Sequence, residues 1–212
     1  MKTAAPIVAP DVMSPFGAYA PSPRRRRLLR LAQNAPRNFV GKQLARWARD
    51  LYLWRAPLPA DVCVDQIRMR CYLRDNTGER KFVFTSWRFD PLEREFMAAT
   101  LDRAGVFVDI GANVGIYTLT AALLMMSSKG GVIALEPYPP AYQRLRFNID
   151  ATLGAADQRH AWPRIDALER PLPRHLIIEN SEALWATDLA KEFTARGYHR
   201  RLRTALNSIY SR

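Results

Sequence analysis

Residues Val106 to Gly115, which read VFVDIGANVG, constrain the fold of this chain more than any other segment. They begin with a short apolar run of the kind that forms a buried parallel strand, and Asp109 lies near its carboxyl end. Gly111 and Gly115 lack side chains, which permits a sharp turn, close approach of a ligand and close packing of the next helix. The segment predicts an α/β fold with a ligand site at the turn; an ordinary strand-to-helix connection is the alternative.

A second strand is expected at Gly131–Leu135, after the apolar helical segment Ile116–Met126, and it is followed by Glu136. The two strands and the segment between them form a predicted β-α-β unit. An acid about 20 or more residues beyond the glycine turn can accept hydrogen bonds from both ribose hydroxyls of an adenosine. We therefore expect Glu136 to bind the ribose of a nucleotide-type cofactor.

The glycine spacing argues against a dinucleotide cofactor. A dinucleotide site has the pattern G-x-G-x-x-G, and this chain has Asn113 and Ile116 where the second and third glycines would stand. The residues that remain are D-x-G-x-N-x-G, from Asp109 to Gly115, with Glu136 after the next strand.

This pattern resembles the S-adenosylmethionine site of class I methyltransferases and, more narrowly, the FkbM family. The resemblance rests on DPLEREFMAATL, VFVDIGANVGIYTLTAA and GVIALEPYPPAYQRLRFNI, which begin at Asp90, Val106 and Gly131. It implies a Rossmann-like sheet and O-methylation of a hydroxyl on a saccharide or natural product. It also implies that the turn lines the methionine part of the cofactor and that Glu136 holds the ribose. The cofactor-binding residues are then Asp109, Gly111, Asn113, Gly115 and Glu136.

The resemblance to the FkbM family weakens after Asp150. That family continues with a segment reading roughly K-I-D-V-E-G-x-E, which this chain lacks. We read Leu176–Glu179 and Asp188–Tyr198 as a later strand and helix that follow a lost internal segment; alternatively, LIIENSEAL is a degenerate form of the missing motif. Either way the sheet is expected to be incomplete. The sequence does not identify a catalytic base or a residue that contacts the methyl acceptor. The alternative function is that of a shortened, inactive relative that acts as a binding or scaffold protein.

The chain divides into three predicted parts. Residues 1–37, with many Pro and Arg residues, are expected to be a disordered arm, and residues 38–60 a basic amphipathic helix. Residues 61–212 are expected to be the methyltransferase-like domain. Within it we predict a β-hairpin at 62–85, a cofactor-binding β-α-β-α unit at 106–150, and a shortened C-terminal part at 151–212.

The predicted amphipathic helix has one apolar face. Val40, Leu44, Trp47, Leu51 and Trp54 recur at spacings of four and three, with basic residues elsewhere. We expect this face to dock against the domain that follows. The alternative is peripheral contact with an anionic membrane.

The charge of the chain is concentrated at its ends. The net charge is +12, and residues 1–60 carry 11 Lys and Arg against two acids. Residues 61–195 are close to neutral, so the positive field belongs to the appendages and not to the predicted cofactor site. A nucleic-acid or membrane-surface binder that uses Arg24 to Arg55 is a third hypothesis, with nucleic acid disfavoured as a partner.

The cysteines and histidines of the sequence indicate the cellular compartment and whether a metal is bound. Cys63 and Cys71 fall on one predicted strand, about 26 Å apart if extended, so they cannot bond to each other there. Sparse, unpaired cysteines favour a reducing, cytoplasmic location, and no apolar run reaches the roughly 20 residues of a membrane span. The three histidines, His160, His175 and His199, lack metal-ligand spacing, so we predict no metal.

Overall fold

The computed structural model describes residues 9–101, 106–127, 130–154, 175–179, 189–204 and 207–212. The described part is a mixed α/β structure, which agrees with the predicted fold class at that level. Along the chain the helices and strands are α1 Pro23–Gln33, α2 Phe39–Leu53, β1 Ala60–Val64, β2 Ile67–Cys71, α3 Thr77–Phe84, the 3-10 turn η1 Ser86–Arg88, α4 Pro91–Thr100, β3 Val106–Ile110, α5 Ile116–Leu124, β4 Gly131–Leu135, α6 Pro139–Leu153, β5 His175–Glu179, α7 Leu189–Ala195, β6 His199–Arg203 and β7 Asn207–Ser211.

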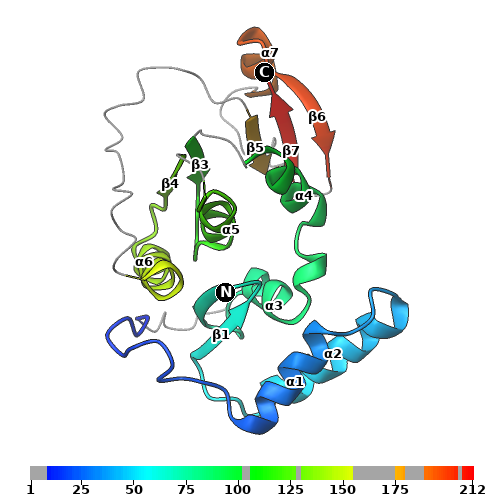
Figure 1. Cartoon of the computed structure of the whole chain (residues 1–212), viewed down its shortest axis with the longest axis vertical. Helices are drawn as coiled ribbons and strands as arrows, with labels where there is room; N and C mark the ends of the chain where they lie inside the picture. Colours follow the sequence, from blue (N-terminus) through cyan, green and yellow to red (C-terminus); the bar gives the residue numbers. More distant parts are fainter. Residues whose placement is uncertain (1–8, 102–105, 128–129, 155–174, 180–188, 205–206) are drawn as a thin grey trace, which may run out of the picture.

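The predicted β-α-β unit is present. Strands β3 and β4 pair in parallel over their whole length, with Val106 opposite Gly131 and Ile110 opposite Leu135. Helix α5 connects them, and α6 follows β4 (Figure 1). The expected strands at Val106 and Gly131 are therefore confirmed.

The predicted hairpin at 62–85 is wrong in its second strand. The hairpin is formed by β1 and β2, and its turn at Asp65 and Gln66 has positive φ angles of 48° and 69° at both positions. Two-residue turns with positive φ match the twist of paired strands, but Asp-Gln is not the usual Asn-Gly signal. Residues 81–84 belong to α3, because the Asn76 side chain accepts a hydrogen bond from the Glu79 amide and begins a helix there.

The cysteines consequently lie on different strands of this hairpin. Cys63 is exposed on β1, opposite Arg68, whereas Cys71 is buried at the end of β2, opposite Ala60. The separation of about 26 Å expected for one extended strand was therefore wrong, because the turn folds β2 back on β1.

The expected disordered arm is also wrong over the described part of residues 9–37. Pro23–Gln33 forms helix α1, whose first turn is capped by the Ser22 side chain. Residues before it are held by Arg70, which donates to the carbonyl oxygens of Asp11, Ser14 and Pro15 at 2.8 to 3.0 Å. Arg70 is itself buried and forms a bidentate ion pair with Asp61. A strand arginine thus binds the N-terminal segment, which composition alone did not predict.

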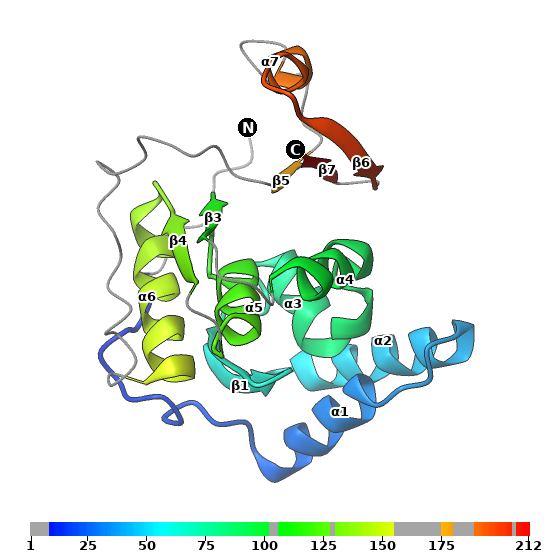
Figure 2. The same ribbon diagram turned by 45° about the horizontal axis from the view of Figure 1, so that its top comes forward.

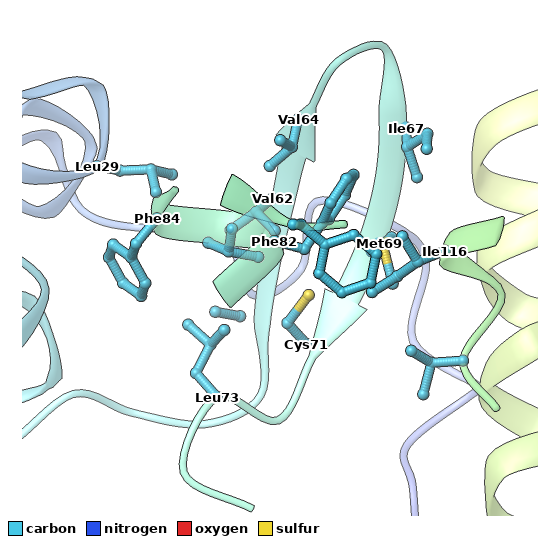
Figure 3. Close-up of a cluster of buried hydrophobic side chains, with 14 of the residues drawn as sticks. Leu29, Val62, Val64, Ile67, Met69, Cys71, Leu73, Phe82, Phe84 and Ile116 are labelled. Atoms are coloured by element: carbon cyan, nitrogen blue, oxygen red, sulfur yellow. The ribbon is translucent and has the colours of Figure 1, made fainter. Parts of the chain in front are cut away.

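One apolar cluster joins the N-terminal helices to the hairpin and to the glycine turn. Figure 3 shows its centre, where side chains of β1, β2 and α3 meet Leu29 of α1 and Ile116 of α5. The cluster extends from Leu29 to Ile149 along the chain. Helices α1 and α2 therefore share a core with the β-α-β unit and are not separate appendages.

Helix α6 covers the free edge of β2. Asn148 accepts a hydrogen bond from the Arg70 amide at 2.9 Å, and Thr152 exchanges two hydrogen bonds with the backbone of Arg68. Side chains of a helix thus satisfy backbone groups that an exposed strand edge would leave unpaired. These hydrogen bonds connect the hairpin to the β-α-β unit.

Strands β5, β7 and β6 form a separate sheet. The central strand β7 is antiparallel to both neighbours, so β5 and β6 run in the same direction with α7 between them. This sheet lies at the opposite end of the molecule from α1 and α2 (Figures 1 and 2). Its link to the rest includes α4, where Glu93 accepts hydrogen bonds from Thr204 and Asn207.

The strand expected at 176–179 is present as β5, and the helix expected at 188–198 is present in shorter form as α7, but β5 does not pair with β3. Residues 164–168, which the sequence suggests as a remnant of the loop before the lost strand, lie outside the described residues. Among the helices described here, none is both long and apolar enough to cross a bilayer.

Candidate functional site

The site predicted from the sequence lies at the carboxyl ends of β3 and β4. The two strands end side by side, and the Leu135 carbonyl accepts hydrogen bonds from the amides of Gly111 and Ala112 at 2.8 and 3.0 Å. Asp109 and Glu136 are therefore brought to the same edge of the sheet. Ligands of open α/β sheets bind at this edge.

The two glycines of the turn have different roles. Gly111 has φ +77°, and a Cβ atom added there would meet nothing within 4 Å. Gly115 has φ +93°, and a Cβ there would lie 2.5 Å from Cδ1 of Leu145 on α6. Both positions favour glycine because of their left-handed backbone. Gly111 leaves open space beside the backbone, whereas Gly115 permits α6 to approach the start of α5.

Glu136 is fixed in place by backbone amides. Its Oε2 atom accepts a hydrogen bond from the Asn113 amide at 2.7 Å, and its Oε1 atom accepts one from the Tyr138 amide at 2.8 Å. Asn113 has φ +50°, a conformation that asparagine tolerates better than most residues, and this turns its amide towards Glu136. A carboxylate offers about four acceptor positions, so about two remain for a ligand.

Asp109 lies deeper than Glu136. Burial raises the pKa of its carboxyl group, the Thr118 hydroxyl opposes that rise by donating a hydrogen bond at 2.5 Å, and the charge of Glu136 adds to it. A nearby negative charge raises the pKa of a carboxyl group, so this effect agrees with the position of the two acids at one edge of the sheet. Asp109 accordingly supports the first turn of α5, while Glu136 faces the more open side.

Two residues of the site were not found from the sequence. Thr118 binds Asp109, and Asn148 on α6, which is fully buried, donates to the Val114 carbonyl at 2.9 Å. Asn148 is three residues after Leu145, on the buried face of α6. A polar residue on an otherwise apolar helical face was the signal that could have identified it.

The described residues do not meet the requirements of a metal site. No group of three or more His, Cys, Asp or Glu side chains there could hold a metal ion. His175 packs edge-on against Phe96 at 5.1 Å between ring centroids, His199 is exposed, and His160 lies outside the described residues.

Two cavities of about 260 Å³ each lie away from the turn. One is lined by residues between Ala18 and Ala60. The other is lined by polar and aromatic side chains, among them Asp65, Trp87 and Arg94. Neither is lined by a residue of the predicted cofactor site.

All five sequence-predicted site residues fall within one turn and its neighbouring strand end. Gly111 and Asn113 are exposed, Glu136 and Asp109 are half-buried, and Gly115 is buried. The arrangement provides an oriented carboxylate with spare acceptor capacity beside uncrowded backbone, which suits a ligand with adjacent hydroxyl groups. Comparisons with family models, with curated proteins and with solved structures found no match for this chain.

Proposed function

We propose that the protein binds S-adenosylmethionine at the turn between β3 and α5. One observation carries the proposal: Glu136, held by the amides of Asn113 and Tyr138, keeps unused acceptor positions next to the open face of Gly111. A ribose presents two adjacent hydroxyl donors, and a carboxylate that is already oriented loses little entropy in accepting both. Asp109 and Asn113 would line the methionine part.

The reaction we propose is methylation of a hydroxyl oxygen on a saccharide or natural product. The bound cofactor supplies the methyl electrophile. The contribution of the chain is to hold the cofactor by Glu136 and the glycine turn and to limit the relative motion of the reactants. The resemblance of Asp109–Gly115 and Glu136 to the FkbM pattern supports this reaction class.

Calorimetry of the full chain with S-adenosylhomocysteine tests cofactor binding. We expect binding that is at least tenfold weaker in Glu136→Gln, because an amide cannot accept through both of its terminal atoms. Glu95→Gln, an exposed acid on α4, is the matched control and should bind normally. Adenosine should compete better than 2′-deoxyadenosine. Absence of binding at millimolar ligand would disprove the proposal.

A second candidate is a shortened relative that binds a ligand or partner without methyl transfer. The observation that favours it is the exposure of β3, whose Val106 and Ile110 are 58% and 80% exposed. A parallel strand is normally covered on both faces, and here β4 is its described partner while β5 belongs to another sheet. Transfer of a labelled methyl group from S-adenosylmethionine to a pool of saccharide acceptors separates the two candidates. Cofactor binding without transfer would favour the second.

A further inference from the structure

Helix α2 buries a different face from the one its sequence predicts. The residues packed inward are small, except for one aromatic: Gly41, Ala45, Ala48 and Tyr52. Gly41 lies so close to the α1–α2 connection that an added Cβ would be 1.8 Å from the Pro36 carbonyl oxygen. The close contact between α1 and α2 thus depends on small side chains, and the larger apolar residues are turned away from it.

The expected docking of the apolar face on the domain is therefore wrong. Val40, Trp47, Leu51 and Trp54 are 69%, 56%, 42% and 66% exposed, and Leu44 alone of the five is partly buried against the core. Phe39, at the start of the same helix, is 72% exposed. We refer to Phe39, Val40, Trp47, Leu51 and Trp54 as the α2 apolar face. Contiguous exposed apolar side chains of this size mark an interaction surface.

The surroundings of the α2 apolar face are strongly basic. Between Pro23 and Arg55 the chain has ten Arg and Lys residues and a single acid, Asp50, which pairs with Arg49 at 2.7 Å. On α1, four arginines are exposed: Arg24, Arg26, Arg27 and Arg30. Arg55 lies over the Trp54 ring, 5.2 Å from its centroid. The partner of this surface must therefore combine negative charge with an apolar interior.

Among possible partners, a lipid surface matches both properties. A second copy would bring two surfaces of like charge together, which disfavours association. A nucleic acid would use the arginines and the tryptophans, but it offers no apolar layer for Phe39, Val40 and Leu51. An anionic bilayer attracts the arginines through its phosphates and accepts aliphatic and tryptophan side chains at the headgroup boundary.

We propose that the α1–α2 helical pair is a docking surface for an anionic membrane. The α2 apolar face enters the headgroup region, and the exposed arginines of α1 add electrostatic attraction. The position of α1 and α2 at one end of the molecule leaves this surface accessible (Figures 1 and 2).

Co-sedimentation of the full chain with vesicles tests the proposal. Vesicles of phosphatidylcholine are compared with vesicles containing about 30% phosphatidylserine, each at low and high salt. We expect the protein to sediment with the anionic vesicles and remain in solution with the neutral ones. High salt should weaken sedimentation without abolishing it, because apolar insertion is not screened.

Two variants separate the apolar and the electrostatic contributions. Trp47→Gln combined with Trp54→Gln removes exposed rings, and Arg24, Arg26, Arg27 and Arg30 changed together to Gln removes exposed charge. Arg25 is left intact because it donates to the Arg55 carbonyl. Each variant should lower partition at least tenfold, whereas Leu92→Gln, an exposed leucine on α4, should not. Circular dichroism checks that every variant folds.

Three results would overturn the proposal. The first is absence of binding to anionic vesicles at low salt, and the second is unchanged binding by the double tryptophan variant. The third is tighter binding to a DNA or RNA oligonucleotide, or self-association in sedimentation velocity, that the same variants abolish. That result would assign the surface to nucleic acid or to a second copy instead.

Discussion

At the scale of single residues, ion pairs that the sequence pattern does not predict hold distant parts of this protein together. Arg70 and Asp61 are both buried, and together they bind backbone groups of the N-terminal segment, including the amides of Gly17 and Tyr19. The Arg70 guanidinium also lies 4.1 Å from the centroid of the Phe147 ring. An arginine on an alternating strand is expected to face solvent, so these contacts could not be foreseen from the pattern.

Replacing Arg70 should destabilise the whole fold. Arg70→Leu leaves Asp61 buried without its ion-pair partner and removes three hydrogen bonds to the N-terminal segment. We expect a loss of about 3 to 5 kcal/mol in the free energy of unfolding, measured by urea titration, and faster proteolysis between residues 9 and 22. Arg68→Leu, its exposed neighbour on β2, is the control. Equal stability of the two variants would contradict this role.

The ion pair between the buried Glu79 and the half-buried Arg144 predicts a pH dependence of stability. Burial raises the pKa of Glu79 from an ordinary value of 4.5 to about 7, although the Arg144 guanidinium beside it limits the rise. Between these values the folded state binds a proton that the unfolded chain has released, so stability falls as pH rises. The contribution is present below about pH 4.5, is lost by about pH 7, and amounts to at most about 3 kcal/mol.

Glu79→Gln tests the sign of this effect. The amide imitates the protonated acid, so the variant should match the natural protein near pH 5 and exceed its unfolding free energy near pH 8. Glu95→Gln on the surface should show no such trend. If Glu79→Gln instead becomes relatively less stable as pH rises, the Arg144 ion pair outweighs burial.

At the scale of elements, the two glycines of the turn can be compared by replacing each with alanine. Gly115→Ala combines left-handed backbone with a collision against Leu145, whereas Gly111→Ala has left-handed backbone alone. We expect Gly111→Ala to cost roughly 1 to 2 kcal/mol and Gly115→Ala about 1 to 3 kcal/mol more, by thermal or urea unfolding. If S-adenosylhomocysteine binds as proposed, Gly111→Ala should weaken it out of proportion to its effect on stability. A larger loss of stability in Gly111→Ala would contradict the packing role of Gly115.

The elements that the sequence predicted well are those defined by local pattern. The apolar runs before Asp109 and Glu136 and the glycine spacing between them were sufficient to identify β3, β4 and the turn. The hairpin was misjudged because the alternation of Cys63, Ile67, Met69 and Cys71 was read as one strand, although the chain turns at Asp65 and Gln66. The buried face of α2 was predicted wrongly because the close contact with α1 requires small residues. This packing requirement decides which face is buried, although the larger apolar residues lie on another face. Asn148 and Arg70 act through long-range contacts, which periodicity does not record.

At the scale of the whole molecule, we expect the stability of the structure to differ along the chain. The apolar cluster from Leu29 to Ile149 contains no residue of the β5–β7–β6 sheet, although Ile209 and Tyr210 of β7, and Tyr198 just before β6, are buried. A small sheet with its own few buried side chains opens at lower free energy than a shared core.

Hydrogen exchange should reveal this difference. We expect the amides of β6 and β7 to exchange before those of β1 and β2 under native conditions. Glu93→Ala should accelerate exchange in β7 without changing β1 and β2, because Glu93 joins α4 to Thr204 and Asn207. A single exchange rate for both regions would show that they unfold as one unit.

The hydrogen bond from Asn148 to Val114 has a consequence for dissecting the protein. The same buried amide accepts from the Arg70 backbone, so the glycine turn is connected directly to the hairpin. A fragment that began at β3 would carry every predicted cofactor-binding residue, yet it would lose β2, against which α6 packs. The smallest piece able to keep the turn in its native shape therefore starts well upstream of the strand that bears it, and we expect loss of the first hundred residues to disable a site whose predicted residues all come after them.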